Sequence, residues 1–201
     1  QAILESDMIV GPVPFSSNNE SVHTPFNSEP IKINDILELM SSTQILIGGR
    51  FDYELKELFE ENNINAIDIL SREEFAVLNA ISTAEGAIQI AMEKSPYTLH
   101  NMDILVVGFG RIGKILCKVL DGLGANVYCE ARKYSDIAWI KAYGYKPIHL
   151  NDLNKEIPKF SLFINTVPYL LFDKTRISKM KEDAIFIDLA SKPGGIDIKA
   201  A

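Results

Sequence analysis

Three glycines in the middle of the chain have a spacing that suits the binding of a phosphate group. Gly108, Gly110 and Gly113 form a GxGxxG pattern, and the positions between them are filled by Phe109, Arg111 and Ile112. A GxGxxG pattern alone occurs by chance and is weak evidence. Here an apolar run precedes it and a helical pattern follows it, which is the context that dinucleotide binding requires.

Each glycine of this pattern has a distinct physical role. Gly108 allows a tight turn, Gly110 lets the backbone approach a pyrophosphate, and Gly113 lets the helix pack closely on the strand. The first N–H groups of the helix and the positive end of its dipole attract phosphate. We therefore predict a dinucleotide site at residues 108–113, with a turn-rich α/β domain that binds no ligand as the alternative.

The end of the following strand indicates which dinucleotide binds. An acidic residue there bonds the ribose of NAD, whereas a nearby Arg accepts the 2′-phosphate of NADP. Strand alternation places Ala131 in the position of that acidic residue and turns Glu130 to the opposite face. Arg132 and Lys133 would then meet a 2′-phosphate. We favour NADP on this basis, with NAD as the alternative cofactor and a solvated basic turn as the interpretation without a ligand.

Two later strand ends are expected beside the cofactor, because ligands of open α/β sheets bind at the carboxyl ends of the strands. The candidate contacts are Thr166, Val167, Pro168, Leu189 and Ala190. Asn165, Thr166 and Asp188 have an alternative role as hydrogen-bond partners within their own turns.

Few side chains suit the role of an acid or base. Glu85 lies in a helical segment, where a buried carboxylate could take a proton, and capping or packing is its alternative role. His100 stands just before the strand that leads to the glycines, where a structural hydrogen bond is expected. His23 and His149 are assigned no catalytic role.

The elements that would position these residues alternate between strands and helices. Strands are predicted at residues 7–10, 44–49, 66–70, 103–107, 126–131 and 184–188, and residues 162–168 are predicted as a strand that runs into a loop. Helices are predicted at residues 36–41 (capped by Asn34 or Asp35), from Asp52 onward, at 73–94 with an interruption near Ser82 and Thr83, and after Gly113. The order strand, helix, strand predicts parallel pairing with right-handed crossovers.

The predicted fold class is therefore α/β, with a doubly wound Rossmann-type NAD(P)-binding domain preceded by a smaller, partial flavodoxin-like α/β domain. We place the substrate-side domain at residues 1–81, an interdomain helix or hinge at 82–100, and the NAD(P)-binding domain at 101–201. There is no initiator Met, and strand-like runs stand close to both ends, so we expect a fragment of a longer chain.

Composition excludes several classes of protein. Lys and Arg total 20 and Asp and Glu total 27, a net charge of −7 that argues against a nucleic-acid binder. No run of about 18 apolar residues indicates a membrane span, and nothing resembles a signal peptide. Cys117 and Cys129 lack metal-ligand spacing and are expected to be buried, reduced thiols. We expect a soluble, cytoplasmic protein without a metal.

The chain resembles a known family, the A subunits of dipicolinate synthase. The stretches that carry the resemblance are residues 82–86 (STAEG), 96–100 (PYTLH), 107–113 (VGFGRIG), 164–168 (INTVP) and 188–197 (DLASKPGGID). Residues 11–14 (GPVP) fit the family's first domain. The glycine pattern is shared with hydroxyacid dehydrogenases and adenosylhomocysteinase, whereas the STAEG and DLASKPGG stretches are more selective.

This resemblance implies an NAD(P)-dependent oxidation of dihydrodipicolinate, or its hydrated precursor, to dipicolinate during sporulation. It also implies a partner, the B subunit of dipicolinate synthase. Because the substrate is a dicarboxylate, cationic or N–H donors should bind it, and the candidates are Pro12, Arg50, Ser82 and Thr83. Rossmann dehydrogenases often dimerise through the cofactor domain, so a homodimer is one arrangement open to the chain.

Two other functions are compatible with the same nucleotide motif. One is a general 2-hydroxyacid or amino-acid dehydrogenase, although the Arg, Glu and His set of that class is not found. The other is a non-catalytic nucleotide sensor. A dicarboxylate that stabilises the protein only with cofactor present would favour an enzyme, and cofactor binding without such an effect would favour the sensor.

Overall fold

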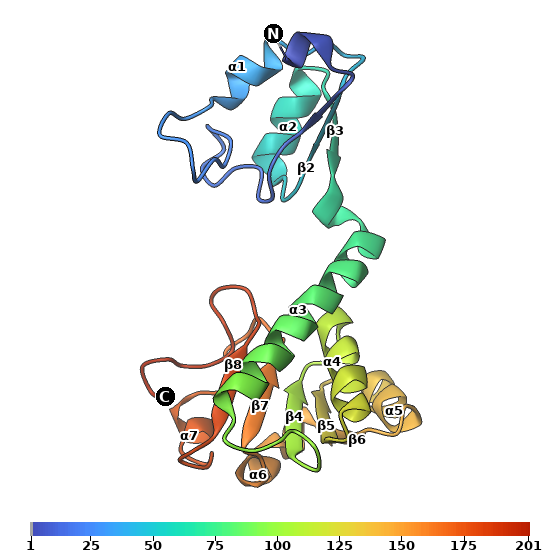
Figure 1. Ribbon diagram of the computed structural model, residues 1–201, viewed down its shortest axis with the longest axis vertical. Coiled ribbons are helices and arrows are strands. Elements are labelled where there is room, and N and C mark those ends of the chain that lie inside the picture. Colours follow the sequence, from blue (N-terminus) through green and yellow to red (C-terminus); the bar gives the residue numbers. More distant parts are fainter. Residues whose placement is uncertain (1) are drawn as a thin grey trace. The chain divides into compact units, whose positions relative to one another are not determined.

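The computed structural model describes residues 2–201, and the chain divides into two compact units (Figure 1). The first ends at Ala76 and the second begins at Val77. The division thus falls a few residues before the boundary placed from the sequence. Residues 82–100 belong to the second unit, and their role as a hinge stays a prediction.

The first unit is a three-stranded parallel sheet with two helices. Its strands β1 (Met8–Val10), β2 (Ile45–Gly48) and β3 (Asn65–Asp68) lie in the order β1-β2-β3. Helix α1 (Ile33–Leu37) precedes β2, helix α2 (Tyr53–Glu61) connects β2 to β3, and single 3₁₀ turns lie at Ile3–Glu5 and Ile69–Ser71. The parallel pairing predicted for this region is confirmed.

An aromatic cluster forms the centre of the first unit. The rings of Phe15, Phe51 and Phe59 pack edge to face, with centroids 5.0–5.9 Å apart, and all three are buried. Asp52 caps α2 as predicted, because its carboxylate accepts the N–H of Leu55 at 3.0 Å. The anchored helix start therefore fixes the course of the chain just after β2.

The second unit is a five-stranded parallel sheet in the order β6-β5-β4-β7-β8. Its strands are β4 (Asp103–Val107), β5 (Asn126–Ala131), β6 (Lys146–His149), β7 (Leu162–Asn165) and β8 (Ile185–Asp188). Its helices are α3 (Glu73–Lys94, which starts before the division), α4 (Arg111–Gly122), α5 (Tyr134–Ala142), α6 (Leu153–Glu156) and α7 (Lys174–Ile177), with 3₁₀ turns at Leu150–Asp152 and Ile157–Lys159. The predicted doubly wound α/β class is confirmed.

Side chains that alternate along the strands of this sheet pack into two separate hydrophobic cores, one on each face. Residues such as Ile104, Val106 and Cys129 pack with buried residues of α3, α4 and α5 on one face. Leu105 and Val107 pack on the other face with residues of α6 and α7. Strands buried on both faces explain the continuous apolar runs in the sequence. The strand order reverses between β4 and β7, which makes their carboxyl ends the switch point of the sheet.

Helix α3 runs without the interruption predicted near Ser82 and Thr83. The hydroxyls of both residues donate to the carbonyl of Asn79, at 3.0 and 3.2 Å. Because both hydroxyls find a hydrogen-bond partner within the helix, they do not interrupt it. Among the described residues, α3 is long and apolar enough to cross a membrane by length and composition alone. One of its faces, which includes Ala84 and Ala87, is buried in the core of the second unit.

Helix α1 differs from the prediction in position and in capping. It covers Ile33–Leu37 and not residues 36–41, and Lys32 stands at its start without a side-chain cap. Neither Asn34 nor Asp35 acts as the cap, because both lie inside the helix. Buried Ile33 and Leu37, one turn apart, hold this short helix on the core of the first unit.

Both cysteines are buried and free, as predicted. Cys117 comes from α4 and Cys129 from β5, and both belong to the same core. A hydrogen bond with Cys117, together with burial, raises the pKa of the Cys129 thiol well above its ordinary value. The two thiols therefore behave as small apolar side chains of the second unit.

Candidate functional site

The backbone of the glycine turn has the geometry that the sequence predicts. Gly108 has a φ of +93°, in the left-handed region, and a Cβ atom there would lie 2.6 Å from Oγ1 of Thr166. At Gly113 a Cβ atom would lie 2.1 Å from the carbonyl oxygen of Gly108. Both positions therefore exclude a side chain, the first because of its turn and the second because α4 packs closely against that turn.

Gly110 differs from its two neighbours because the space beside it is open. A Cβ atom at Gly110 would meet no atom within 4 Å. Gly110 is also the N-cap of the 12-residue helix α4 and, having no side chain, makes no side-chain cap to its first turn. The helix therefore presents N–H groups and the positive end of its dipole beside an open backbone, which fits a pyrophosphate.

A pocket of about 600 Å³ lies at this end of the sheet. Its lining comes from the end of β5, from the segments that follow β4, β5, β6 and β7, and from α5: Gly108, Phe109, Gly110, Glu130, Ala131, Arg132, Lys133, Asp136, Leu150, Val167, Tyr169 and Leu171. It thus opens at the switch point, where open α/β sheets bind their ligands. Its volume is within the range of small-molecule and cofactor sites.

The end of β5 supplies the polar wall of this pocket. Ala131 is buried in the same core as Val127 and Cys129, whereas Tyr128 belongs to the core of the other face. Glu130 has the parity of Tyr128, and it nevertheless lines the same pocket as Ala131. Arg132 and Lys133 follow Ala131, line the pocket and are exposed. Two cationic side chains therefore line the pocket directly after this strand.

The sequence did not predict that Glu130 would be buried and would line the pocket. Only 3% of it is exposed, and it lines the pocket despite its opposite parity. Burial raises the pKa of its carboxyl group to about 6, and the Gly108 N–H, His149, Arg176 and Arg132 oppose that rise. A buried carboxyl with such a pKa changes charge close to neutral pH.

The loops that follow β7 and β8 are tied together by one hydrogen-bond network. Nδ2 of Asn165 donates to Oδ1 of Asp188 at 2.8 Å and to the carbonyl of Val167 at 3.0 Å. Oδ2 of Asp188 accepts the N–H of Gly195 at 2.8 Å. Thr166 donates its hydroxyl to the carbonyl of Val107 at 2.9 Å. Asn165, Thr166 and Asp188 therefore hold the loops beside the pocket.

Several predicted residues of the second unit lie outside this pocket. Glu85 is exposed on α3, so the expectation of a buried carboxylate there is wrong. His100 packs against Gly124, where a Cβ atom would lie 2.5 Å from its ring, at the amino end of the sheet. His100 is exposed, and its predicted structural hydrogen bond stays a prediction. The predicted cofactor residues that do not line the pocket are Arg111, Ile112, Gly113, Thr166, Pro168, Leu189 and Ala190.

Two predicted substrate residues, Pro12 and Arg50, lie in loops of the first unit that contact each other. The N–H of Phe15 donates to the carbonyl of Gly49 at 2.8 Å, and a Cβ atom at Gly49 would lie 2.8 Å from Val13. The structure thus brings the loops that follow β1 and β2 together. Ser82 and Thr83 belong to the second unit, and their participation in the same site stays a prediction.

The pocket also contains residues that no sequence motif indicated. Asp136 comes from the first turn of α5, Leu150 from the turn after β6, and Tyr169 and Leu171 from the loop after β7. The apolar run of residues 167–171 could have indicated a wall of the site. Within residues 2–201 no group of three or more His, Cys, Asp and Glu side chains could hold a metal ion.

Two family models match the chain, one for each unit. Residues 1–70 match the family described as the N-terminal domain of the dipicolinate synthase A subunit. Residues 73–194 match the family described as D-isomer specific 2-hydroxyacid dehydrogenase, NAD binding domain. The second match covers the glycine turn and the pocket, so it agrees with the nucleotide site derived from their geometry.

Known proteins match over nearly the whole chain. The dipicolinate synthase A subunit of Bacillus subtilis is 30% identical over 196 residues, which are 97% of this chain and 66% of that protein. The crystal structure of the dipicolinate synthase A subunit from Bacillus halodurans has a TM-score of 0.88 at 29% identity, covering 99% of this chain and 69% of that one. The A chain of dipicolinate synthase from B. subtilis has a TM-score of 0.86 at 30% identity, covering 97% and 66%. The chain thus spans about two thirds of the length of these relatives.

Proposed function

The chain belongs to the family of dipicolinate synthase A subunits, and from this premise we propose that it oxidises dihydrodipicolinate, or its hydrated precursor, to dipicolinate with a nicotinamide dinucleotide. The observation that carries the proposal is the glycine turn at the switch point of the second unit, where Gly110 leaves the backbone open beside the start of α4. A family match to an NAD-binding domain covers the same residues.

The proposed reaction removes two hydrogens from a dihydropyridine ring. One leaves as a hydride and the other as a proton, and loss of both makes the ring aromatic. When bound, the nicotinamide accepts the hydride, which is the harder part of the chemistry. Gly110 and the first N–H groups of α4 would hold the pyrophosphate, and Gly108 and Gly113 would shape the turn that presents them. The loops fixed by Asn165 and Asp188 would border the reacting ring. We assign the proton to no residue.

We propose that NADP is the preferred cofactor. Ala131 occupies the position that an acidic residue takes in NAD-binding sheets, and Arg132 and Lys133 line the pocket directly after it. Arg132→Ala should weaken NADP⁺ binding about tenfold or more and leave NAD⁺ binding nearly unchanged, because the lost bond is to a charged phosphate. Glu130→Gln is the matched test of the alternative, since it would weaken NAD⁺ binding if Glu130 bonded the ribose.

The experiment that tests the function is thermal unfolding with NADP⁺, NAD⁺ or neither, each with and without dipicolinate. A ligand that binds the native state alone stabilises it by about 2.7 kcal/mol at a hundredfold excess over its Kd. We expect the larger increase in Tm with NADP⁺, and a further increase when dipicolinate is added. Turnover of dihydrodipicolinate, followed by the absorbance of the reduced nicotinamide, then tests the reaction itself.

Other results of the thermal-unfolding experiment would favour other functions. Stabilisation by cofactor with no effect of dipicolinate would favour a nucleotide sensor. Stabilisation by a 2-hydroxyacid in place of dipicolinate would favour a general dehydrogenase, the class named by the second family match. No shift with either dinucleotide would refute the interpretation of the glycine turn.

We also propose a biological setting: a cytoplasmic enzyme of sporulation that acts with the B subunit of dipicolinate synthase. The support for this setting is the family relationship. Size-exclusion chromatography of the chain with and without the B subunit tests the partnership. A shift to a larger complex is expected, and separate elution of the two proteins at micromolar concentration would refute a stable complex.

A further inference from the structure

Arg50 has a backbone conformation that arginine rarely adopts. Four residues other than glycine have a positive φ in the described part of the chain, and three of them are Asn. The fourth is Arg50, with a φ of 63°. Asn tolerates this left-handed region and Gly prefers it, whereas a long side chain is strained there. The presence of Arg at a position suited to Gly points to use of its side chain.

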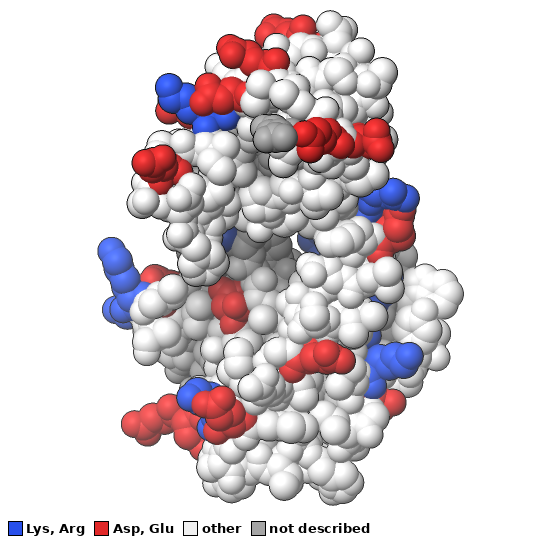
Figure 2. Space-filling view, turned by 45° about the horizontal axis from the view of Figure 1, so that its top comes forward, with Lys and Arg blue, Asp and Glu red and all other residues white. Residues whose placement is uncertain are grey.

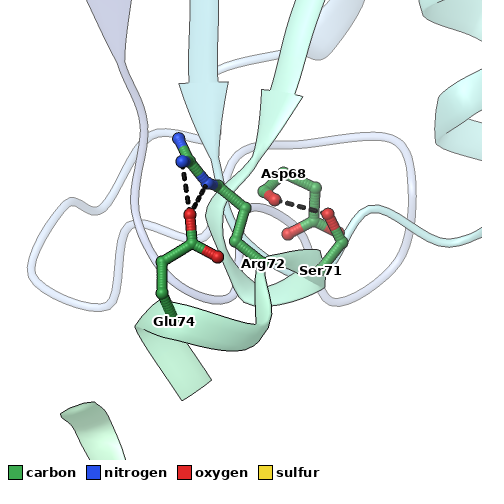
Figure 3. Close-up of polar contacts among 4 residues, drawn as sticks. All are labelled: Asp68, Ser71, Arg72 and Glu74. Carbon is green, nitrogen blue, oxygen red and sulfur yellow. Dashed lines mark hydrogen bonds and ion pairs between the residues drawn. The ribbon is translucent and has the colours of Figure 1, made fainter. Parts of the chain in front are cut away.

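The carboxylate of Asp68 holds this strained residue in place. Oδ1 of Asp68 accepts the N–H of Arg50 at 3.0 Å, and Oδ2 accepts the N–H of Phe51 at 3.0 Å. Oδ1 also accepts the N–H of Leu70 at 2.9 Å. Figure 3 shows Asp68 at the end of β3, with the hydroxyl of Ser71 bonded to its carbonyl at 2.7 Å. The carboxylate of Asp68 thereby fixes two consecutive N–H groups of the loop that carries Arg50.

The residues around Arg50 direct its side chain away from the core. Gly49 and Phe51 are buried, and the ring of Phe51 belongs to the aromatic cluster of the first unit. Arg50 itself is exposed. Because both neighbours are anchored in the core, the left-handed turn presents the guanidinium outward at the carboxyl end of β2, the end at which open α/β sheets bind ligands.

The charge of the first unit makes this cation distinctive. Residues 1–76 contain 14 Asp and Glu but only four Lys and Arg. Figure 2 shows the resulting excess of acidic side chains over this unit. Arg72 is paired with Glu74, as Figure 3 shows. Within residues 2–201 the guanidinium of Arg50 has no hydrogen bond or ion pair, so it is available to an anion.

We infer that Arg50 binds a carboxylate of a small dicarboxylate ligand, and that Asp68 is the positioning residue that holds it. A guanidinium binds carboxylate through two parallel N–H donors, and a fixed backbone reduces the entropy that such binding costs. The inference concerns the first unit and takes its ligand class, a pyridine dicarboxylate, from the proposed function. It selects Arg50 from the candidates that the sequence offered, assigns Asp68 its role, and explains the strained loop.

The test is a set of variants that separates ligand binding from stability. Arg50→Gly removes the guanidinium and relieves the positive φ, so we expect an equal or higher Tm together with about tenfold or more weaker binding of dipicolinate in saturating NADP⁺. Asn63→Gly is the matched control, because Asn63 is an exposed residue of the same unit with a φ of 55°. It should keep or raise the Tm and leave binding unchanged.

Two further measurements sharpen the assignment. Pyridine-2-carboxylate lacks one carboxylate, so Arg50→Gly should weaken its binding less than that of dipicolinate, which measures the coupling between guanidinium and carboxylate. Asp68→Asn should lower both Tm and dipicolinate affinity, because one carboxylate oxygen that accepts an N–H of the loop is replaced by a donor.

The outcomes distinguish this inference from the proposed function. If wild-type protein binds dipicolinate and Arg50→Gly binds it equally well, the inference is wrong and the function stands. A lower Tm for Arg50→Gly would also overturn it, since the side chain would then serve packing. If wild-type protein binds NADP⁺ but not dipicolinate, the proposed substrate and the inference both fail.

Discussion

Substitution of Gly113 by alanine should damage the second unit by a calculable amount. The added Cβ would lie 2.1 Å from the carbonyl oxygen of Gly108 and 3.0 Å from its carbonyl carbon. These atoms are backbone, and the N–H of Gly108 is bonded to the carbonyl of Glu130 at 3.0 Å, so the turn cannot yield freely. Overpacking costs about 1–3 kcal/mol, and an overlap with backbone belongs at the upper end.

The higher helix propensity of alanine offsets part of this loss of stability. Gly113 lies in the first turn of α4, and Ala is favoured over Gly inside a helix by up to about 1 kcal/mol. The free energy of unfolding should therefore fall by about 2 kcal/mol, taking the difference between the overpacking and propensity effects. Because the overlap moves the turn that faces the pyrophosphate, the affinity for NADP⁺ should fall as well.

Gly110→Ala is the matched control within the same glycine turn. Its Cβ would meet no atom within 4 Å, and its φ of −79° is open to any residue. Stability should fall by only about 0.5–1 kcal/mol, the cost of Ala for Gly at an N-cap. NADP⁺ affinity should nevertheless fall about tenfold or more, since the methyl group fills the open space left for the phosphate.

Urea unfolding followed by tryptophan fluorescence measures the stability of the correct unit, because Trp139 is the one tryptophan of the chain and lies in α5. Titration with NADP⁺ gives the affinity of each variant. The reasoning is refuted if Gly113→Ala is as stable as the wild type, or if Gly110→Ala loses stability but keeps its affinity. Either result would mean that the two glycines do not have the separate roles assigned to them.

Three further outcomes are expected from other parts of the second unit. The pKa of Glu130 is raised from 4.5 to about 6 in the folded state, so stability should fall by about 2 kcal/mol in total as the pH rises from well below 4.5 to well above 6, and urea unfolding of Glu130→Gln should lack this decrease. Gly86→Ala should raise the free energy of unfolding by about 0.5–1 kcal/mol, because its Cβ meets nothing within 4 Å inside α3; unchanged or lower stability would contradict this. Asn165→Asp places a carboxylate beside Asp188 and should cost about 2 kcal/mol or more at pH 7, with partial recovery near pH 5; equal losses at the two pH values would rule out charge repulsion.

The nucleotide-binding half of the fold was predictable from local sequence. The strand before Gly108 and the strand ending at Ala131 have the predicted bounds, because each is a continuous apolar run bounded by turn residues. The roles of the three glycines were also predictable, since each depends on backbone geometry within a few residues. Alternation along β5 correctly placed Ala131 on the same face as Val127.

Features that depend on distant contacts were not predictable in the same way. Helix α1 starts at Ile33 because buried contacts hold it, and no capping side chain marks its first residue. The burial of Glu130 depends on loops after β6 and β7, whose course is fixed elsewhere; Leu171, for example, donates its N–H to the carbonyl of Gly195 at 3.1 Å. The exposure of Glu85 follows from which face of α3 packs on the sheet.

The pair of buried thiols gives the second unit a built-in reporter of its own opening. Cys117 and Cys129 are the two cysteines of the chain, and the first unit has none. A thiol reagent can reach them only when the core between α4 and β5 separates. When reclosing is faster than labelling, the rate of modification therefore measures the equilibrium between closed and open forms of this unit alone. A bound dinucleotide should slow that labelling by the same factor by which it lowers the open population.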